Sequence, residues 1–592
     1  MKSILPNIRA DMLVAEDERP VDATKQAEAG EKEPPTAQTV ETDDESISSQ
    51  DQTGIRMIEA TTKVWSTSNL VMAYVMIWII AFVDTMQQGM SGSLTPYVTS
   101  SFNEHSLTAA TSIMSGIIGG LFKLPLAKIL DIWGRPQGFA LMMVVLTIGL
   151  VMMAGCNNVK TYAAAQVFYW VGYNGMTYTI SIFIADTSSL KNRGLMLAYV
   201  GSPYIATVWI GGPLATAFLN GPGFRWGFGA FAIITPVITS PLLALFTWNY
   251  LKAKKAGLLP PKVDENRSVL QSLKHYAIEF DVIGIILLSG GLALFLLPFS
   301  LYSYQADGWR SSMIICMIIF GGLLIITFAV YERFWSPRCF IPFHLLTDRT
   351  VLGACILAAT LFVSFYIWDT YFSSFLQVVN DLSITQASYI GNIYSIGSCF
   401  WSLVVGVLIR WSGRFKWLAL YFGVPLTILG VGLMVHFRQP DVNIGYIIMC
   451  QIFIAFAGGT LVICEQMAAM AAVSHQYIAV VMAVESMFSS IGGAVGSTIA
   501  AAIWTGVFPK RLTEYLPEEE QGNLTQIYGS LPVQRSYPVG SPARIAINRA
   551  YGESQKVMLI AATVILVIAI GATVVWRDIK VKDFKQVKGR VV

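Results

Sequence analysis

The sequence predicts an all-α integral membrane protein with fourteen transmembrane helices, and three observations support this fold class. Of the 592 residues, 54% are hydrophobic and only 13% are charged. The mean hydropathy is +0.56, a value that a soluble globular surface does not support. Apolar windows of about 20 residues recur from Asn69 onward, and each is long enough to cross a hydrocarbon core as a helix. The formal charge of +3 does not favour a nucleic-acid partner.

The first segment, residues 1–65, is polar and acidic, so we expect a disordered tail. Its run from Glu41 to Ser49 is compatible with a regulatory role or with simple solvation. The apolar windows follow it. We expect membrane spans at 69–90, 107–129, 137–154, 161–186, 195–218, 227–250, 280–301, 312–332, 350–372, 387–409, 417–436, 444–472, 477–506 and 556–576.

Basic residues gather in every second loop and predict the orientation of the chain. The loops on the opposite side carry few basic residues. Because basic loops face the cytoplasm, an even number of spans places both termini inside, including the basic tail 577–592. The basic loops carry Lys128, Arg135, Lys191, Arg193, Lys252, Lys254, Lys255, Lys262, Arg267, Lys274, Arg333, Arg338, Arg349, Arg410, Arg414 and Lys416, and the opposite loops carry Lys160, Arg225, Arg310 and Arg438.

One outward loop is long, residues 507–555, and contains a glycosylation sequon at Asn523. It also contains Tyr515, Tyr528, Tyr537 and Tyr551. Loops of this length are usually functional or disordered. Both an entry role for the loop and a glycosylated spacer are compatible with its composition.

A short pattern recurs in two basic loops and indicates an internal repeat. The loop after the second predicted span contains Asp131, Gly134 and Arg135, and the loop after the tenth contains Arg410, Gly413 and Arg414. We therefore expect two six-helix bundles, residues 66–250 and 350–576, joined by a linker, 251–279, and an inserted helix pair, 280–332. Transporter repeats of this kind enclose a central substrate site.

The first copy of the pattern resembles the cytoplasmic loop signature of the major facilitator superfamily, G-x-L-x-D-R-x-G-R. It departs from that signature at Ala127 and Ile132, which stand at a Gly and an Arg position. The resemblance implies the major facilitator fold. The Asp of such a loop attracts the N-terminus of a helix in the other half and so locks the cytoplasmic side, whereas an ordinary turn with flanking charges is the alternative.

Four further segments resemble the fungal siderophore-iron transporters, a fourteen-helix branch of that superfamily. The similarity extends from about residue 65 to 576. It implies import of ferric siderophore complexes by proton symport. The segments are Phe82-Val-Asp84-Thr-Met-Gln-Gln-Gly, Tyr366-Ile-Trp368-Asp369-Thr-Tyr371, Glu465-Gln-Met-Ala-Ala-Met and Ser541-Pro-Ala-Arg544-Ile-Ala-Ile-Asn-Arg-Ala-Tyr551.

Ionisable residues inside predicted spans are candidates for proton coupling, because burying a charge in a membrane is expensive. Asp84 lies in the outer half of the first span, where it can bind a proton or serve as a hydrogen-bonded structural residue. Lys123, Glu465 and Glu485 lie at similar depth near the cytoplasmic ends of three spans. We expect a Lys123–Glu485 pair between the bundles that closes the inner gate, with Glu465 exchanging the proton. A static pair retained for folding is the alternative.

Other residues are candidates for substrate contact or helix geometry. Asp369, with Tyr366, Trp368 and Tyr371, forms either an aromatic wall for a bulky chelate or part of an interfacial belt. The family resemblance adds Tyr551 as a residue that helps to admit the substrate.

Two further motifs concern helix ends and helix packing. Asp186 is expected to cap the helix that follows it. Gly201 and Pro203, with Gly212 and Pro213, predict a kink and close packing in the fifth span. Their resemblance to a motif of drug–proton antiporters keeps an export function open.

The sequence therefore favours proton-coupled import of a ferric siderophore, with a drug or glutathione exporter and a nutrient receptor as alternatives. The sequence shows no nucleophile elbow and no phosphate loop, so it does not predict an enzyme. We expect no cofactor and no direct metal site, because iron enters inside its chelator. The expected partners are the siderophore complex, protons and lipid. The chain is expected to be a monomer, in the plasma membrane or in endosomal vesicles.

Overall fold

The computed structural model describes residues 64–101, 118–257, 269–279, 281–302, 305, 307–337, 343–474 and 477–582, all within one compact unit, 48–592. Every regular element in these ranges is a helix. The predicted tail 1–65 lies almost wholly outside the described residues, as does the end of the basic tail, 583–592.

The helices fall into three sets along the chain. The first set is Thr67–Ser101 (α2), Lys123–Ile132 (α4), Arg135–Ala154 (α5), Val159–Thr187 (α6), Leu190–Gly201 (α7), Tyr204–Asn220 (α8) and Phe224–Lys255 (α9). The second set is Val269–Glu279 (α10), Val282–Leu296 (α11), Pro298–Leu301 (α12), Gly308–Arg310 (η3), Ser312–Phe334 (α13) and Phe343–Thr347 (α14). The third set is Arg349–Asp369 (α15), Phe372–Val378 (α16), Ile384–Gly391 (α17), Ile393–Ser412 (α18), Lys416–Leu418 (α19), Ala419–Gly423 (η4, a π-helix), Val424–Phe437 (α20), Ile444–Ala471 (α21), Ile478–Tyr515 (α22), Glu518–Asn523 (η6), Leu524–Gly529 (α23), Leu531–Ser536 (α24), Pro542–Ile565 (α25) and Val567–Val574 (α26).

The prediction of many membrane-spanning helices is confirmed, whereas the count of fourteen is not. Among the described residues, 11 helices are long and apolar enough to span a membrane, or 12 with the bent pair Leu270–Ile278 and Val282–Leu296. The expected span 161–186 coincides with α6, which is helical but carries polar side chains such as Gln166 and Asn174 that lower its hydropathy. The expected span 107–129 lies partly outside the described residues.

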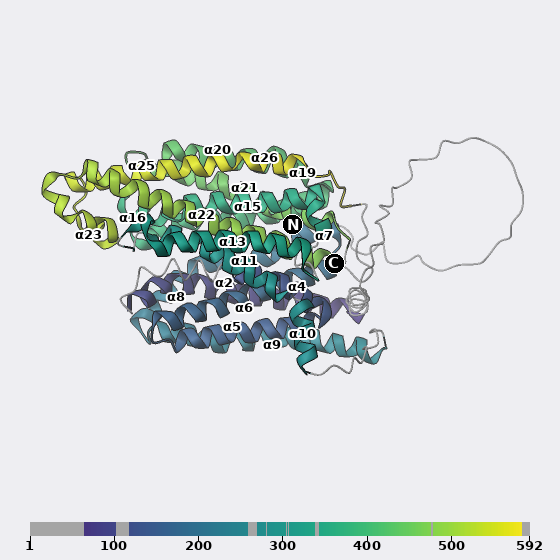
Figure 1. The fold of residues 1–592 in the computed structure, drawn as a ribbon. Helices are drawn as coiled ribbons and strands as arrows, with labels where there is room; N and C mark the ends of the chain where they lie inside the picture. The colour runs from purple at the N-terminus through teal and green to yellow at the C-terminus, as the bar shows by residue number, and fades with distance from the viewer. Residues whose placement is uncertain are drawn as a thin grey trace, which may run out of the picture. The chain divides into compact units, whose positions relative to one another are not determined.

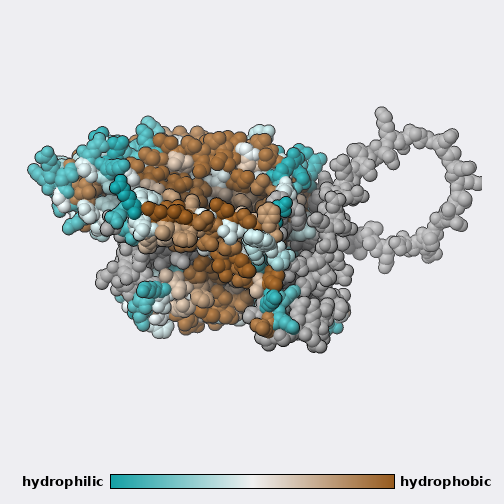
Figure 2. Space-filling model, viewed as in Figure 1, coloured by the Kyte–Doolittle hydropathy of each residue, from teal (hydrophilic) through white to brown (hydrophobic). Residues whose placement is uncertain are grey.

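Helices α2 and α4–α9 pack with one another, and so do α15–α26, while α11 packs mainly on α13. Figure 1 shows the first set in purple and blue and the third in green and yellow, with their long helices running in a common direction. Figure 2 shows a brown apolar belt across these helices, with teal hydrophilic residues at both ends. Such a belt is what a bilayer requires of a spanning bundle.

Helix α22 is 38 residues long and crosses α15 at very close range. A Cβ atom added at Gly492 would lie 2.4 Å from the carbonyl oxygen of Ala359, and one at Gly496 would lie 2.5 Å from that of Val363. Only glycine permits this backbone approach. The two glycines therefore fix the point at which α22 and α15 touch.

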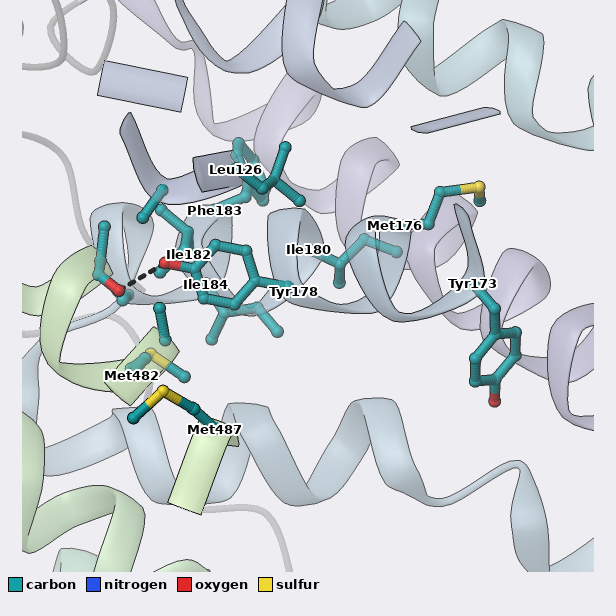
Figure 3. Close-up of a cluster of buried hydrophobic side chains, with 14 of the residues drawn as sticks. Leu126, Tyr173, Met176, Tyr178, Ile180, Ile182, Phe183, Ile184, Met482 and Met487 are labelled. Carbon is teal, nitrogen blue, oxygen red and sulfur yellow. Dashed lines mark hydrogen bonds between the residues drawn. The ribbon is translucent and has the colours of Figure 1, made fainter. Parts of the chain in front are cut away.

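The two halves meet near the ends that the sequence places inside. Tyr178 of α6 donates a hydrogen bond to the carbonyl oxygen of Ala479 in α22. Figure 3 shows this ring beside Met482 and Met487, with the hydrogen bond as a dashed line. At the opposite end, the contacts include a hydrogen bond of 3.4 Å from Asn392 to Val208.

Candidate functional site

A buried polar cluster surrounds Asp84 of α2, which is 5% exposed. The hydroxyl groups of Tyr173 in α6 and Tyr204 in α8 lie 3.1 Å apart, and both donate to the side-chain oxygen of Gln88. Tyr169, Tyr173 and Tyr204 all lie close enough to Asp84 to interact with its carboxyl group electrostatically. A carboxyl group beside such a hydroxyl network has polar neighbours that can stabilise either protonation state.

The fifth predicted span is interrupted where the sequence predicts a kink. Helix α7 ends at Gly201 and α8 begins at Tyr204, after Pro203. Pro213 lies inside α8 without ending it. The close helix packing predicted at Gly212 occurs one residue earlier, at Gly211. A Cβ atom at Gly212 would have no neighbouring atom within 4 Å.

Gly211 makes the close contact instead. A Cβ atom at this position would lie 2.8 Å from the carbonyl carbon of Gly89 in α2. The backbone contact holds α8 against the helix that carries Asp84.

Two buried carboxylic acids and one lysine form a second cluster, which we call the inner carboxyl layer. It consists of Lys123 in α4, Glu465 in α21, and Glu485 with Ser486 in α22. Glu465 is 1% and Glu485 5% exposed, and their carboxyl groups lie close enough to interact electrostatically. Two like charges so close together in a buried site disfavour the ionisation of both groups at once. The structure thus brings together the three ionisable residues that the sequence placed at one depth.

The lysine of this layer connects the two halves of the chain. Its ammonium group donates to the Ser486 hydroxyl and lies near enough to Glu485 for electrostatic attraction. The structure thus differs from the expected direct pair, because Lys123 hydrogen-bonds to Ser486 and is attracted to Glu485 only electrostatically.

The first loop motif turns sharply at Gly134, whose φ of 106° favours glycine. The turn directs Arg135 toward α6, where its Nε lies 3.0 Å from the carboxylate of Asp186. The prediction that Asp186 caps the next helix is wrong, because its carboxylate pairs with Arg135 and Ser189 is the N-cap residue of α7. Asp131 belongs to α4, and its side chain lies outside the described part of the chain.

The second loop motif binds the segment that follows α26. Gly413 ends α18 with a φ of 73°, and its carbonyl oxygen accepts a hydrogen bond of 2.9 Å from Val581. Arg414 lies 3.3 Å from the carboxylate of Asp578. Arg410 is exposed on the last turn of α18. Each loop thus holds an arginine against an aspartate from another segment.

The outer aromatic residues are mostly packed inside the second half, which differs from the predicted aromatic wall. Trp368 is 2% exposed. Tyr371 stacks on Trp504 of α22 with ring centroids 4.3 Å apart. Tyr366 alone among the predicted substrate-contacting rings keeps a large exposed fraction, 38%.

Asp369 has a buried cationic neighbour that the sequence analysis assigned only to a loop. Arg438, at the end of α20, is 0% exposed, attracts Asp369 and donates to the carbonyl oxygen of Trp368 over 2.7 Å. Its guanidinium also lies 4.4 Å from the ring centroid of Phe372. Such a cation over an aromatic face stabilises the junction between α15 and α16.

The long outer loop is an ordered unit, which we call the outer subdomain, residues 507–555. Arg544 of α25 organises it, with its side chain 1% exposed. Its guanidinium donates to the carbonyl oxygens of Val378, Gln534 and Tyr537 and pairs with Asp381 at 3.2 Å. These bonds join the subdomain to α16.

Tyr551 lies in the core of this subdomain. It is 1% exposed, its ring packs on Trp504 and Phe508, and its hydroxyl donates to Gln534 over 2.8 Å. This position supports the fold of the subdomain and differs from the expected contact with substrate. A single tyrosine in a predicted loop does not distinguish these two roles without the tertiary structure.

The glycosylation sequon lies on the surface of the outer subdomain. Asn523 is exposed and donates to Glu520 over 2.8 Å. Hydrogen bonds from Asn523 and Tyr537 hold the pKa of Glu520 below its usual range. The carboxylate therefore ties the sequon to the neighbouring turn while Asn523 stays accessible.

Helix α18 packs against α7 and α8 of the first half. Every residue from Ile393 to Val404 is at least partly exposed, and this stretch includes Tyr394, Ser395 and Ser398. This stretch of α18 is therefore not packed on all sides, whereas the Asp84 side chain is buried. Within the described residues, no group of three or more His, Cys, Asp or Glu side chains is arranged to hold a metal ion.

The most important residues that the sequence analysis missed are Tyr173, Tyr204, Gln88 and Arg438. Tyr169 and Tyr173 lie four residues apart on α6, a spacing that puts them on one face and was an available signal. The partners in α8 and α20 could not be assigned without helix packing.

The two helical halves, the glycine-arginine loops and the buried ionisable residues define a membrane transporter of the major facilitator type. The Major Facilitator Superfamily profile matches residues 77–346. Relatives extend the match over nearly the whole chain. The chain is 76% identical over 558 residues to "MFS siderochrome iron transporter 1" of Ajellomyces capsulatus, covering 94% of this chain and 95% of that protein.

A second and a third relative agree. "Siderophore iron transporter mirB" of Emericella nidulans is 43% identical, covering 96% of this chain and 94% of that protein. "MFS siderochrome iron transporter D" of Aspergillus fumigatus is 44% identical, covering 91% and 90%. The chain belongs to the fungal siderophore-iron transporter family of the major facilitator superfamily. It is a multi-pass membrane protein and, as predicted, a transporter by family and not an enzyme.

Proposed function

We propose that this protein imports ferric siderophore complexes by proton symport and alternating access. The observation that carries the substrate class is the near full-length similarity to relatives named as siderophore or siderochrome iron transporters. The two buried polar clusters support the coupling mechanism. One surrounds Asp84 within the first half, and the other lies where the halves meet.

The inner carboxyl layer couples proton movement to opening of the inner gate. Glu465 and Glu485 share one proton, while Lys123 holds α4 against α22 through Ser486 and the charge of Glu485. A second proton on Glu485 removes its attraction for Lys123, and the contact between the halves weakens. Loss of that proton to the cytoplasm restores the attraction and closes the gate.

The Asp84 cluster serves the outward-facing state. Asp84 accepts a proton from the outer side, and the tyrosine hydroxyls and Gln88 offer donors and acceptors to the polar edge of a chelate. Tyr366 and the partly exposed face of α18 supply contact area from the second half. The substrate is a whole iron complex, so the protein needs no iron ligand and no cofactor.

The proposed topology has fourteen spans, with both termini in the cytoplasm and the outer subdomain outside, where Asn523 carries a glycan. The plasma membrane is the proposed location, and the monomer the proposed state. An exporter remains a second candidate, because the break between Gly201 and Tyr204 and the contact of Gly211 with Gly89 match the antiporter-like motif.

The test is uptake in yeast that lacks its own siderophore transporters. Radioiron-labelled coprogen, ferrichrome, fusarinine and catecholate complexes are supplied with and without a protonophore. Uptake of one complex that stops with the protonophore supports symport. Uptake that persists contradicts proton coupling. No uptake at confirmed surface expression favours the exporter or a receptor.

The role of Asp84 is tested with Asp84→Asn, which keeps the shape of the side chain but cannot ionise. We expect proton-driven uptake to be lost while binding of the complex at the cell surface persists. Thr85→Val, at a neighbouring buried position, is the control for packing changes. Full uptake by Asp84→Asn would assign Asp84 to structure alone.

A further inference from the structure

Helix α10 is an amphipathic helix between two membrane-spanning helices. It follows α9 in the chain, precedes α11, and is bent by 53° from α11. Figure 1 shows α10 lying crosswise to the long helices, at the end where α4 and the basic loops lie. Because both neighbouring helices enter the membrane, this direction places α10 along the membrane surface.

One face of α10 is exposed and largely apolar. Its exposed residues are Leu270, Gln271, Lys274, Ala277 and Ile278, three of them apolar, and they recur with the i, i+1, i+4, i+7, i+8 spacing of one helix face. Leu270 is 76% exposed and Ile278 is 40% exposed. Lys274 lies among them, where its long side chain can reach toward headgroups while its stem covers apolar surface. We call this surface the α10 face.

Further cations lie at the end of the preceding membrane helix. Lys252, Lys254 and Lys255 occupy the last turn of α9, and all are exposed. With Lys274 they give four exposed lysines, three at the end of α9 and one on α10. Basic side chains beside an apolar helix face are complementary to an anionic lipid surface.

The helix also contacts the first loop motif. The ring of Tyr276 lies 5.9 Å from that of Trp133 in an edge-to-face arrangement. Trp133 directly precedes Gly134 and ends α4, the helix that carries Lys123. A movement of α10 is therefore transmitted to the first loop motif, whose Arg135 pairs with Asp186 of α6.

We propose that α10 is a membrane-surface anchor that binds anionic lipid headgroups and steadies the first loop motif through Tyr276 and Trp133. The α10 face enters the boundary between headgroups and acyl chains, and the four lysines bind phosphate or carboxylate groups of the lipids. The inference is independent of the transported substrate. It uses the proposed topology only to name the leaflet as cytoplasmic.

The test measures hydrogen exchange of the full chain in nanodiscs of phosphatidylcholine alone or with phosphatidylserine. We expect peptides covering 269–279 and 133–137 to exchange more slowly with phosphatidylserine. Each lysine replaced by glutamine is expected to weaken this protection about fivefold. Equal exchange in both lipids overturns the proposal. Protection that follows the number of protein copies per disc, and not the lipid, assigns the α10 face to a second copy and also overturns it.

Three variants separate the parts of the proposal, with Lys160→Gln in an opposite loop as the control. Leu270→Gln with Ile278→Gln is expected to abolish the protection of both peptides. Tyr276→Ala is expected to keep protection of α10 but to lose that of 133–137. If Tyr276→Ala leaves 133–137 protected, the link to the loop motif is refuted while lipid binding stands on the other variants. If Lys160→Gln weakens protection as much as Lys274→Gln, the effect is net charge and the proposed site fails.

Discussion

Replacing Arg544 by methionine is expected to release the outer subdomain from α16. The guanidinium is 1% exposed and binds the carbonyl oxygens of Val378, Gln534 and Tyr537. Methionine fills similar space but donates nothing, so these acceptors lose their partner. Each buried acceptor left without a donor costs about 1–3 kcal/mol, so the loss of several of them is expected to cost about 3–5 kcal/mol. A loss of this size raises the population of the opened subdomain by about two to three and a half orders of magnitude.

The assay is limited proteolysis of the purified chain, with cleavage followed inside residues 507–555. Arg511→Ala is the matched control, because Arg511 is 41% exposed and pairs with Glu514 at 2.7 Å and Glu553 at 3.0 Å. Surface pairs of this kind contribute about 0–1 kcal/mol. If Arg544→Met is cleaved no faster than Arg511→Ala, the buried hydrogen bonds do not hold the subdomain and the reasoning fails.

Three other perturbations test the inner layer, the outer subdomain and the α2–α8 contact. Lys123→Glu and Glu485→Lys are each expected to abolish uptake, and the double variant to restore part of it at equal surface expression. Because the pKa of folded Glu520 is lowered, its carboxylate stabilises the subdomain above the unfolded pKa of about 4.3, and that contribution disappears as pH falls through the folded pKa. Glu520→Gln should therefore remove part of the acid sensitivity seen in proteolysis. Gly211→Val should lower the melting temperature and uptake, since its Cβ would lie 2.8 Å from the backbone of Gly89.

Each of these has a control in the chain. Gly212→Val is the partner of the glycine variant, because nothing lies within 4 Å of a Cβ there. Equal damage by both valines would show that the close contact is irrelevant. Glu518→Gln, in the same turn as Glu520, controls for charge alone. If the double charge swap is as inactive as either single variant, Lys123 and Glu485 do not act as a pair.

The ionisable residues of the membrane helices could be predicted from sequence, because a charge within an apolar window is conspicuous. Asp84 and the inner carboxyl layer were found this way. Their partners could not be, since Tyr173 and Tyr204 lie on different helices and tyrosine is common in membrane helices for other reasons. The pairing of Arg135 with Asp186 was missed for a related cause, because local capping is the simplest role for an aspartate at a helix end.

The outer subdomain shows a different limit. Its composition predicted a functional or disordered loop, yet the structure is held by Arg544 and Tyr551 reaching residues that are not adjacent in sequence. Whether a polar loop is ordered depends on such long-range hydrogen bonds, which no local pattern records. The loop signature, in contrast, was predictable, because a positive φ at Gly134 and at Gly413 is a local requirement.

The close contact of α22 with α15 gives the long helix the geometry of a lever. Gly492 and Gly496 form the pivot, and Glu485 lies about 14 Å from its centre toward the inner end. Tyr515, within the outer subdomain, lies about 32 Å from it toward the outer end. A small tilt about the glycines therefore moves the outer end about twice as far as the carboxyl group. Under the proposed proton symport, a tilt that follows protonation of Glu485 is thus larger at the outer face of the membrane than at the inner one.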